Sequence, residues 1–223
     1  YALGYSLDSV MNYPLRTAII EFLKGQRSAY GLRDLLISQR MNYPRPLYFS
    51  LMNLLGSHDV ERLRNALAVD VTIKSLSRED QIKLQFSQER LDKALQLEKM
   101  AAAIQFSVPG VPCIYYGDEQ GMCGVGDPFN RAMFRENSTN LVEFYKKLVK
   151  IRNTNPCMLE GRAYYYALST CILVILRCTA DGKNVFGEPS VPSATATIIN
   201  RGLSAGECIL DLSDKNLPSL HTV

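Results

Sequence analysis

An apolar run that ends in four small or polar residues constrains the fold of this chain more than any other segment. The run is Leu51-Met52-Asn53-Leu54-Leu55, and it is followed by Gly56-Ser57-His58-Asp59. Its length and composition predict a buried parallel strand that delivers polar side chains to its carboxyl end. In barrels built from strand–helix repeats, catalytic groups lie at that end. The chain has only 2 histidines, so an imidazole at this position is informative.

Composition narrows the classes of protein to consider. The chain has 223 residues, 47% hydrophobic and 21% charged, which is typical of a soluble globular protein with a sizeable core. The net charge of +3 is small and the cations often stand beside acids, so we expect no nucleic-acid partner. No apolar run reaches the ~18–20 residues that span a bilayer, so we expect no membrane partner.

The cysteine pattern argues against a metal site. None of the 6 cysteines belongs to a Cys-x-x-Cys pair or has a histidine close by in the sequence; they lie at positions 113, 123, 157, 171, 178 and 208. We expect free thiols, no metal and no cofactor. No signal peptide is recognisable, so the bacterial cytoplasm is a better expectation than secretion.

Strand and helix patterns alternate up to residue 156. Helical spacing of apolar residues predicts helices over 17–23, 32–40, 90–106 and 141–152. Strands are expected near 7–11, where Pro14 then breaks the pattern, and over 51–56 and 113–116. We expect a proline-rich loop over 43–46 and a polar region from Asp59 to about Asp80.

The pattern changes beyond Pro156. β-branched and aromatic runs separated by turn residues predict antiparallel strands over 164–168, 171–177, 195–200 and 208–212. We therefore predict an α/β domain over 1–156 and a small antiparallel β domain over 157–223.

Three motifs in order give the chain a family resemblance. They are Asp8-Ser9-Val10-Met11-Asn12-Tyr13-Pro14, the segment from Leu51 to Asp59, and Gly110-Val111-Pro112-Cys113-Ile114-Tyr115-Tyr116-Gly117-Asp118-Glu119. With Asp127-Pro128 and Arg131, they resemble the α-amylase superfamily, glycoside hydrolase family 13, and within it the neopullulanase and cyclomaltodextrinase branch. The resemblance covers residues 7 to about 155.

The resemblance implies a TIM (β/α)8 barrel, of which this chain would supply the C-terminal part. The strands near 7–11, 51–56 and 113–116 would be strands 6–8, followed by a C-terminal β-sandwich. The family's nucleophile Asp and acid Glu would then lie upstream of Tyr1, so the chain by itself should not hydrolyse glucans. Gly31-Leu32-Arg33-Asp34 loosely matches the nucleophile motif, but its spacing is wrong, and we interpret Asp34 as a solvated helix residue.

The resemblance also implies roles for His58 and Asp59. Retaining glycosidases use two carboxylates about 5–5.5 Å apart, and this family adds a third Asp that holds the sugar's 2- and 3-hydroxyls. Asp59 would be that transition-state stabiliser, and His58 would donate a hydrogen bond to a sugar hydroxyl. The alternative is that Asp59 caps the following segment and His58 is a buried, satisfied imidazole.

Three further residues are candidates for substrate binding. Asp127 and Arg131 could hold a glucose unit beyond the cleavage point, or they could form a surface ion pair contributing roughly 0–1 kcal/mol. Tyr13 could stack on a sugar face, although aromatic residues at strand ends more often belong to the core. For Asp118 and Glu119, shaping a loop is a better interpretation than catalysis.

Two functions follow from these expectations. The first is the C-terminal portion of an enzyme that cleaves α-glucosidic bonds in oligosaccharide or polysaccharide glucans. The alternative is a non-catalytic, amylase-like module that binds carbohydrate or protein. Three barrel strands leave a parallel edge unpaired, so we also expect a homo-oligomer or a complex with a missing N-terminal half.

Overall fold

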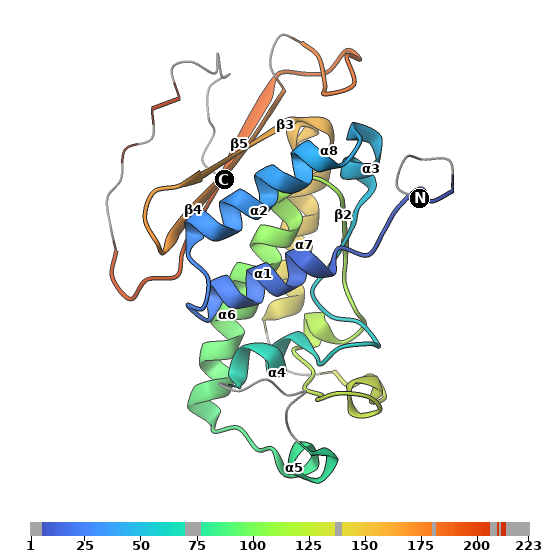
Figure 1. The fold of residues 1–223 in the computed structure, drawn as a ribbon, viewed down its shortest axis with the longest axis vertical. Coiled ribbons are helices and arrows are strands. Elements are labelled where there is room, and N and C mark those ends of the chain that lie inside the picture. Colours follow the sequence, from blue (N-terminus) through green and yellow to red (C-terminus); the bar gives the residue numbers. More distant parts are fainter. Residues whose placement is uncertain are drawn as a thin grey trace.

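The computed structural model describes residues 6–69, 77–136, 140–179, 182–205, 209 and 211–212. Eight helices occur among these residues (Figure 1): α1 Tyr13–Leu23, α2 Ala29–Asn42, α3 Arg45–Ser50, α4 Leu63–Ala68, α5 Arg78–Lys83, α6 Gln88–Ser107, α7 Leu141–Thr154 and α8 Pro156–Glu160. The strands are β1 Met52–Leu54, β2 Val111–Cys113, β3 Arg162–Ala167, β4 Ile172–Thr179 and β5 Ser193–Asn200, and two short 3-10 turns are η2 Asp118–Gln120 and η3 Phe129–Arg131.

Three parallel segments lie side by side in the first part of the chain. β1 pairs with β2 in parallel register, with Met52 opposite Val111. On its other side β1 forms a parallel bridge between Met52 and Met11. The buried run over 51–56 is therefore the middle of the three segments, as its continuous apolar character predicts.

β2 lies earlier than the predicted strand over 113–116. Pairing begins at Val111, whose N–H donates to Leu51 O at 2.8 Å. It ends after Cys113, where the side-chain amide of Gln105 donates to Asn53 O at 2.8 Å and Cys113 O at 2.9 Å. A side chain from α6 thus takes the place of further strand-to-strand hydrogen bonds.

Helix α1 begins at Tyr13, not at residue 17. Asn12 accepts a hydrogen bond from Leu15 N at 3.3 Å through its side chain, and Pro14 occupies the first turn. Proline suits that position because its missing N–H would have no partner inside the helix. Pro14 therefore starts a helix rather than merely ending a strand.

Two further predictions about local structure are wrong. The segment predicted as a loop over 43–46 gives way to α3 at Arg45. The region after Asp59, predicted to be polar, contains α4, in which Leu63, Ala66 and Leu67 are buried. Only six residues long, α4 is held by packing against α6 and α1 rather than by its own periodicity.

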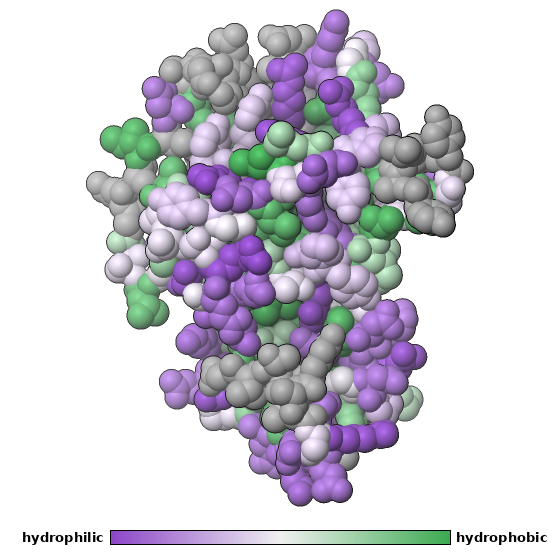
Figure 2. Space-filling model, viewed as in Figure 1, coloured by the Kyte–Doolittle hydropathy of each residue, from purple (hydrophilic) through white to green (hydrophobic). Residues whose placement is uncertain are grey.

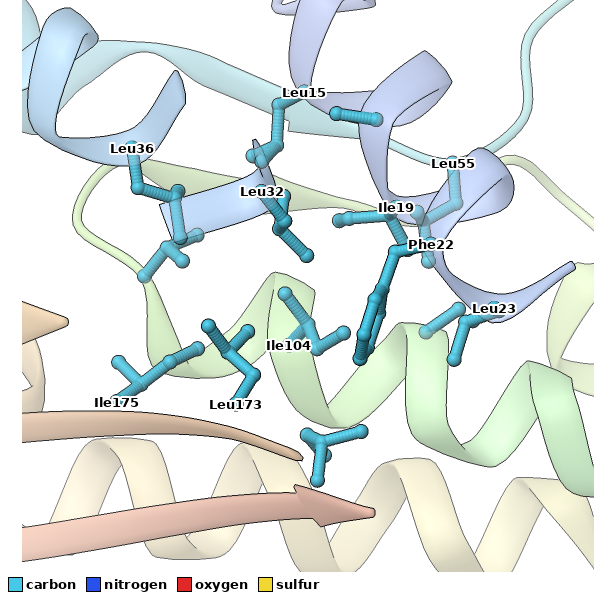
Figure 3. Close-up of a cluster of buried hydrophobic side chains, with 14 of the residues drawn as sticks. Leu15, Ile19, Phe22, Leu23, Leu32, Leu36, Leu55, Ile104, Leu173 and Ile175 are labelled. Carbon is cyan, nitrogen blue, oxygen red and sulfur yellow. The ribbon is translucent and has the colours of Figure 1, made fainter. Parts of the chain in front are cut away.

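One hydrophobic core joins the helices to the antiparallel sheet. Apolar side chains from α1, α2, α6 and β4 converge there (Figure 3), including Leu15, Ile19, Phe22, Leu32, Leu36, Ile104, Leu173 and Ile175. Burial of such side chains contributes about 1.5–3 kcal/mol each. On the face shown in Figure 2, hydrophilic residues dominate the end that carries α5, and hydrophobic side chains surface in small patches elsewhere.

The sheet of the C-terminal part has three strands in the order β3-β4-β5, all antiparallel. The described residues contain no second sheet facing it; Leu173, Ile175 and Ile199 pack into the core with the helices. The sandwich expected for residues 157–223 is therefore not seen in the described part of the chain. Of the fourth predicted strand, 208–212, residues 208 and 210 lie outside the described residues, and the other three are not in a strand. The domain boundary at 156–157 stays a prediction.

Candidate active site

The candidate site is built on the loop between β1 and α4. This loop leaves the carboxyl end of β1 and carries Ser57, His58 and Asp59. Arg16, buried in α1, fixes its two ends: Nε donates to Leu55 O at 2.8 Å and Nη2 donates to Glu61 O at 3.0 Å. A single guanidinium therefore sets the span of the loop.

Tyr13, His58 and Asp59 are in direct contact. The Tyr13 hydroxyl donates to Asp59 Oδ2 at 3.1 Å and lies 3.0 Å from Ser57 Oγ. His58 Nε2 lies 3.1 Å from Asp59 Oδ1, and the two side chains are 55% and 56% exposed. His58 is thus not the buried imidazole of the alternative interpretation. Asp59 does not cap α4 either, since the residue at that position is Arg62.

Arg131 connects the second predicted pair to this cluster. Its Nε forms an ion pair with Asp127 Oδ1 at 2.7 Å, and its Nη2 donates to His58 O at 3.4 Å. All five residues singled out in the sequence therefore form one continuous series of contacts. The Asp127–Arg131 pair is half-exposed, so its geometry fits both a surface ion pair and groups open to a ligand.

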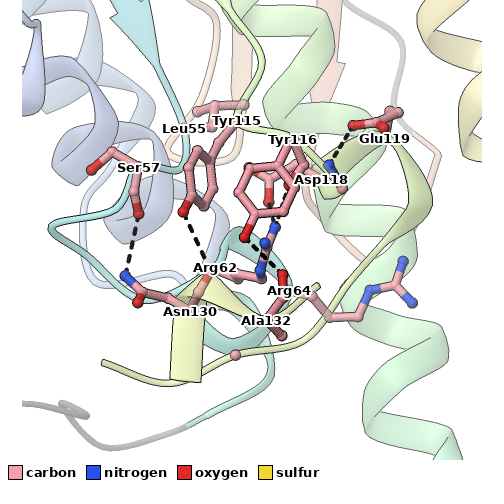
Figure 4. Close-up of polar contacts among 12 residues, drawn as sticks. Leu55, Ser57, Arg62, Arg64, Tyr115, Tyr116, Asp118, Glu119, Asn130 and Ala132 are labelled. Atoms are coloured by element: carbon pink, nitrogen blue, oxygen red, sulfur yellow. Dashed lines mark hydrogen bonds and ion pairs between the residues drawn. The ribbon is translucent and has the colours of Figure 1, made fainter. Parts of the chain in front are cut away.

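Asn130 holds the His58 loop and was missed in the sequence. Its side chain is buried, and Nδ2 donates to the main-chain oxygens of Val60 at 2.7 Å, His58 at 2.9 Å and Ser57 at 3.4 Å. Figure 4 shows Asn130 beneath Ser57. The one available signal was its place between Asp127 and Arg131, because an amide in such a motif can bond main-chain groups.

The buried side chain of Arg62 packs against two tyrosine rings next to the site. Its guanidinium carbon lies 4.8 Å from the centroid of the Tyr115 ring and 4.7 Å from that of Tyr116. Nη1 donates to Tyr116 O at 2.6 Å and to Asp118 Oδ1 at 3.3 Å (Figure 4). Two aromatic faces and one carboxylate thus surround a fully buried cation, which offsets part of its desolvation cost.

Asp118 is a buried carboxyl under the loop. Burial raises its pKa to about 7; Arg62 opposes this, whereas Glu98 and Glu119 add to it. Gly56 allows the backbone after β1 to approach the Asp118 carboxyl closely, because a Cβ on Gly56 would lie 2.3 Å from Asp118 Oδ2. The glycine of the second motif and the aspartate of the third thus meet, one just after β1 and the other in the segment after β2.

Glu119 and Tyr116 differ in their surroundings. Glu119 Oε2 accepts from Gly117 N at 2.9 Å, which closes the turn before η2. This geometry supports a loop-shaping role for Glu119. Tyr116 is 39% exposed, and its hydroxyl donates to Ala132 O at 2.7 Å, so it belongs to the wall of the site.

The described residues offer neither a metal-binding cluster nor a membrane-spanning helix. Within the described ranges, no three His, Cys, Asp or Glu side chains lie close enough together to hold a metal ion. In the same part of the chain, none of the helices has the length and apolar character needed to cross a bilayer. The described cysteines 113, 123, 157, 171 and 178 are free thiols, and Cys208 lies outside the described residues.

Comparison with known protein families gives one match over most of the chain. The family described as "Alpha amylase, catalytic domain" matches residues 1–140. An amylopullulanase from Thermoanaerobacter thermohydrosulfuricus is 36% identical over 214 residues, which cover 90% of this chain and 14% of the amylopullulanase. A cyclomaltodextrinase from Thermoanaerobacter pseudethanolicus is 34% identical over 160 residues, covering 68% of this chain and 23% of that enzyme.

A solved structure shows the same arrangement of elements. The cyclic α-maltosyl-(1→6)-maltose hydrolase from Arthrobacter globiformis, in complex with cyclic α-maltosyl-(1→6)-maltose, superposes with a TM-score of 0.70 at 28% identity. The match covers 91% of this chain and 39% of that hydrolase. The chain thus spans 14%, 23% and 39% of the lengths of these three proteins.

Proposed function

Because this chain belongs to the α-amylase family, we propose that His58 and Asp59 serve the retaining cleavage of α-glucosidic bonds in glucans. The observation that carries the proposal is the Tyr13–Asp59–His58 cluster at the carboxyl ends of parallel segments. In strand–helix barrels that end is the catalytic one. Met11, β1 and β2 would correspond to barrel strands 6, 7 and 8.

Asp59 would act as the third carboxylate of the family. Its Oδ2 accepts a hydrogen bond from Tyr13, and its Oδ1 lies 3.1 Å from His58 Nε2. A carboxylate has about four lone-pair sites, so capacity remains for two sugar hydroxyls. Contacts that tighten as the ring distorts would favour the oxocarbenium-like transition state.

His58 would donate a hydrogen bond to a sugar hydroxyl in the same subsite. Its side chain is 55% exposed beside Asp59, which supports this role. Arg131 and Asp127, next along the series of contacts, would bind a further glucose unit.

We further propose that the nucleophile Asp and acid Glu lie outside these 223 residues. The substrates we favour are maltodextrins, cyclomaltodextrins and pullulan, through cleavage of α-1,4 and α-1,6 links. The chain covers only 14% and 23% of two of its relatives, which supports the proposal that these two carboxylates lie elsewhere in the protein. Self-association or a complex with the remaining barrel would cover the outer edges of the parallel strands.

The isolated chain should therefore bind glucans without hydrolysing them. Titration calorimetry with maltotriose tests binding, and Asp59→Asn should weaken it about tenfold or more because hydrogen bonds to a charged group are lost. Unchanged affinity in Asp59→Asn would contradict the role of Asp59. Asp34→Asn, at an exposed carboxylate of α2, is the matched control.

Hydrolysis is tested on starch, pullulan and cyclomaltodextrin with the same proteins. We expect no activity from the 223-residue chain. Activity that Asp59→Asn abolishes would show that the chain carries a complete catalytic set, whereas activity equal in both proteins would be a contaminant. A longer product of the same gene that binds glucan without cleaving it would favour the non-catalytic module.

A further inference from the structure

A cavity of about 680 Å³ lies at the opposite end of β1 from Asp59. It is half open and is lined by the end of α2, by α3, by β3 and by the loop over 183–187. α3 leads directly into β1 and Asp59 follows β1, and no lining residue belongs to the candidate active site, so the cavity is separate from that site. Its size is that of a pocket for a small organic molecule.

The charged residues that line the cavity are all cations: Arg40, Arg45, Arg162 and Lys183. Arg40 Nη1 donates to Ala163 O at 2.9 Å and Arg45 Nη1 donates to Val185 O, so both guanidinium groups are held in place with donors to spare. Arg162 and Lys183 have no ion-pair partner within the described residues. Among the described residues, the side chains that line the cavity therefore carry an excess of positive charge.

Two carboxylates near the cavity offset only part of the charge of the four lining cations. Those of Glu160 and Glu188 do not line the cavity, and both accept from Nδ2 of the lining residue Asn184, at 2.6 Å and 3.0 Å. The buried Arg177 lies under Phe49, with its guanidinium carbon 5.9 Å from the ring centroid, and it donates to main-chain oxygens only. Low-dielectric walls concentrate such a field inside a cavity.

The lining of the cavity also contains aromatic side chains, two of which are in contact. Phe49 and Phe186 meet edge to face with centroids 5.5 Å apart, and Tyr43 lines the same space. Asn184 fixes the loop through its Oδ1, which accepts from Phe186 N at 2.9 Å and Glu188 N at 3.0 Å. A preformed pocket loses less affinity to ordering on binding.

We propose that this cavity binds a small organic phosphate, a phosphomonoester carried on a ring. Arginine forks match the oxygens of a phosphate, and Lys183 adds a mobile positive charge. The ring would pack against Phe49, Phe186 and Tyr43. The ring is either a sugar or an aromatic group, and the cavity would recognise the phosphate in the same way in both cases.

Calorimetric titration of the 223-residue chain tests the proposal with three probes: glucose 6-phosphate, phenyl phosphate and inorganic phosphate. We expect one ring phosphate to bind at least about tenfold more tightly than inorganic phosphate, and that probe identifies the ring. Excess maltose should not displace it, which separates this site from the Asp59 site. Displacement by maltose, equal affinity for inorganic phosphate, or no saturable binding would overturn the proposal.

Two variants locate the site. Arg162→Gln and Lys183→Gln should each weaken binding of the ring phosphate about tenfold, because each removes one exposed cation from the cavity. Lys147→Gln removes one exposed cation from α7, away from the cavity, and should leave the affinity unchanged. Equal weakening in all three would mean attraction to net charge only, and would overturn the assignment. Matching circular dichroism melts verify that each variant is folded.

Discussion

The side-chain amide of Asn130 donates to the main-chain oxygen of His58 across 2.9 Å, although 72 residues separate the two in sequence. The same nitrogen bonds Val60 O at 2.7 Å. The loop that carries His58 and Asp59 is therefore fixed through its backbone, which leaves their side chains open to solvent. Positioning by a second layer of this kind is what an active-site loop requires.

Removing this amide should destabilise the protein. Asn130→Ala leaves buried carbonyl groups without a partner, which costs about 1–3 kcal/mol of unfolding free energy. Urea denaturation followed by circular dichroism measures the loss. Asn42→Ala, at an exposed position on α2, should change stability by less than about 0.5 kcal/mol. Equal stability of Asn130→Ala and the native chain would contradict the role of this amide.

The Tyr13 hydroxyl should matter for ligand binding more than for stability. Tyr13→Phe removes the donor to Asp59 Oδ2 and leaves the ring in place. A hydrogen bond to a charged group contributes about 1.5–3 kcal/mol, so maltotriose affinity should fall roughly tenfold. Calorimetry is the measurement, with Tyr30→Phe, on the exposed side of α2, as the control. Undiminished affinity would mean that Asp59 needs no orientation by Tyr13.

Gly56 should not tolerate a methyl group. In Gly56→Ala the new Cβ would lie 2.3 Å from Asp118 Oδ2, and this carboxyl is buried and cannot move aside freely. Overpacking of this kind costs about 1–3 kcal/mol. Gly126→Ala is the matched control, because its Cβ would meet only the end of the Gln81 side chain, at 3.3 Å. Denaturation midpoints that shift equally in both variants would refute the steric explanation.

Asp118 should make stability fall as the pH rises from about 4 to about 7. Burial raises the pKa of native Asp118 from 3.8 to about 7, so in this window the unfolded chain releases a proton that the native chain keeps. The stabilisation is complete below the unfolded pKa and is lost as the pH passes the native value. Burial also raises the pKa of Glu98 to about 7, against the effect of Arg64, and this adds a contribution of the same sign.

Asp118→Asn tests this linkage. The variant should reduce the slope of unfolding free energy against pH by up to roughly 1 kcal/mol per pH unit, because one titrating group is removed. The titration of Glu98 should account for the part of the slope that remains. The slope is the quantity to compare, since the substitution also changes absolute stability by altering the partner of Arg62. An unchanged slope between pH 4 and 7 would show that the pKa of Asp118 is not raised.

Local sequence patterns were enough to predict the main elements. The apolar run over 51–56 contains β1, and the periodic segments over 17–23, 32–40, 90–106 and 141–152 lie within α1, α2, α6 and α7, which extend beyond them by up to four residues. These predictions succeed because a side chain's periodicity along the chain decides which face can be buried. Prediction failed at α3 and α4, six-residue helices whose stability comes from neighbours distant in sequence.

The residues of the candidate site also fall into a group that could be predicted from the sequence and a group that could not. Its exposed groups, Tyr13, His58, Asp59, Asp127 and Arg131, were recognisable from motifs. The supporting residues Arg16, Arg62 and Asn130 were not, because an arginine or asparagine that bonds main-chain oxygens has no pattern of its own in the sequence. What they bind is fixed only when the chain folds.

By itself, the sequence determined the strand with polar residues at its end, the helical faces and the family to which the chain belongs. Only the tertiary structure decided that Tyr13 reaches Asp59 across 46 positions and that the C-terminal strands share a core with the helices. The physical reason is range: periodicity and capping act over a few residues, whereas burial and hydrogen bonding join whichever groups the fold brings together.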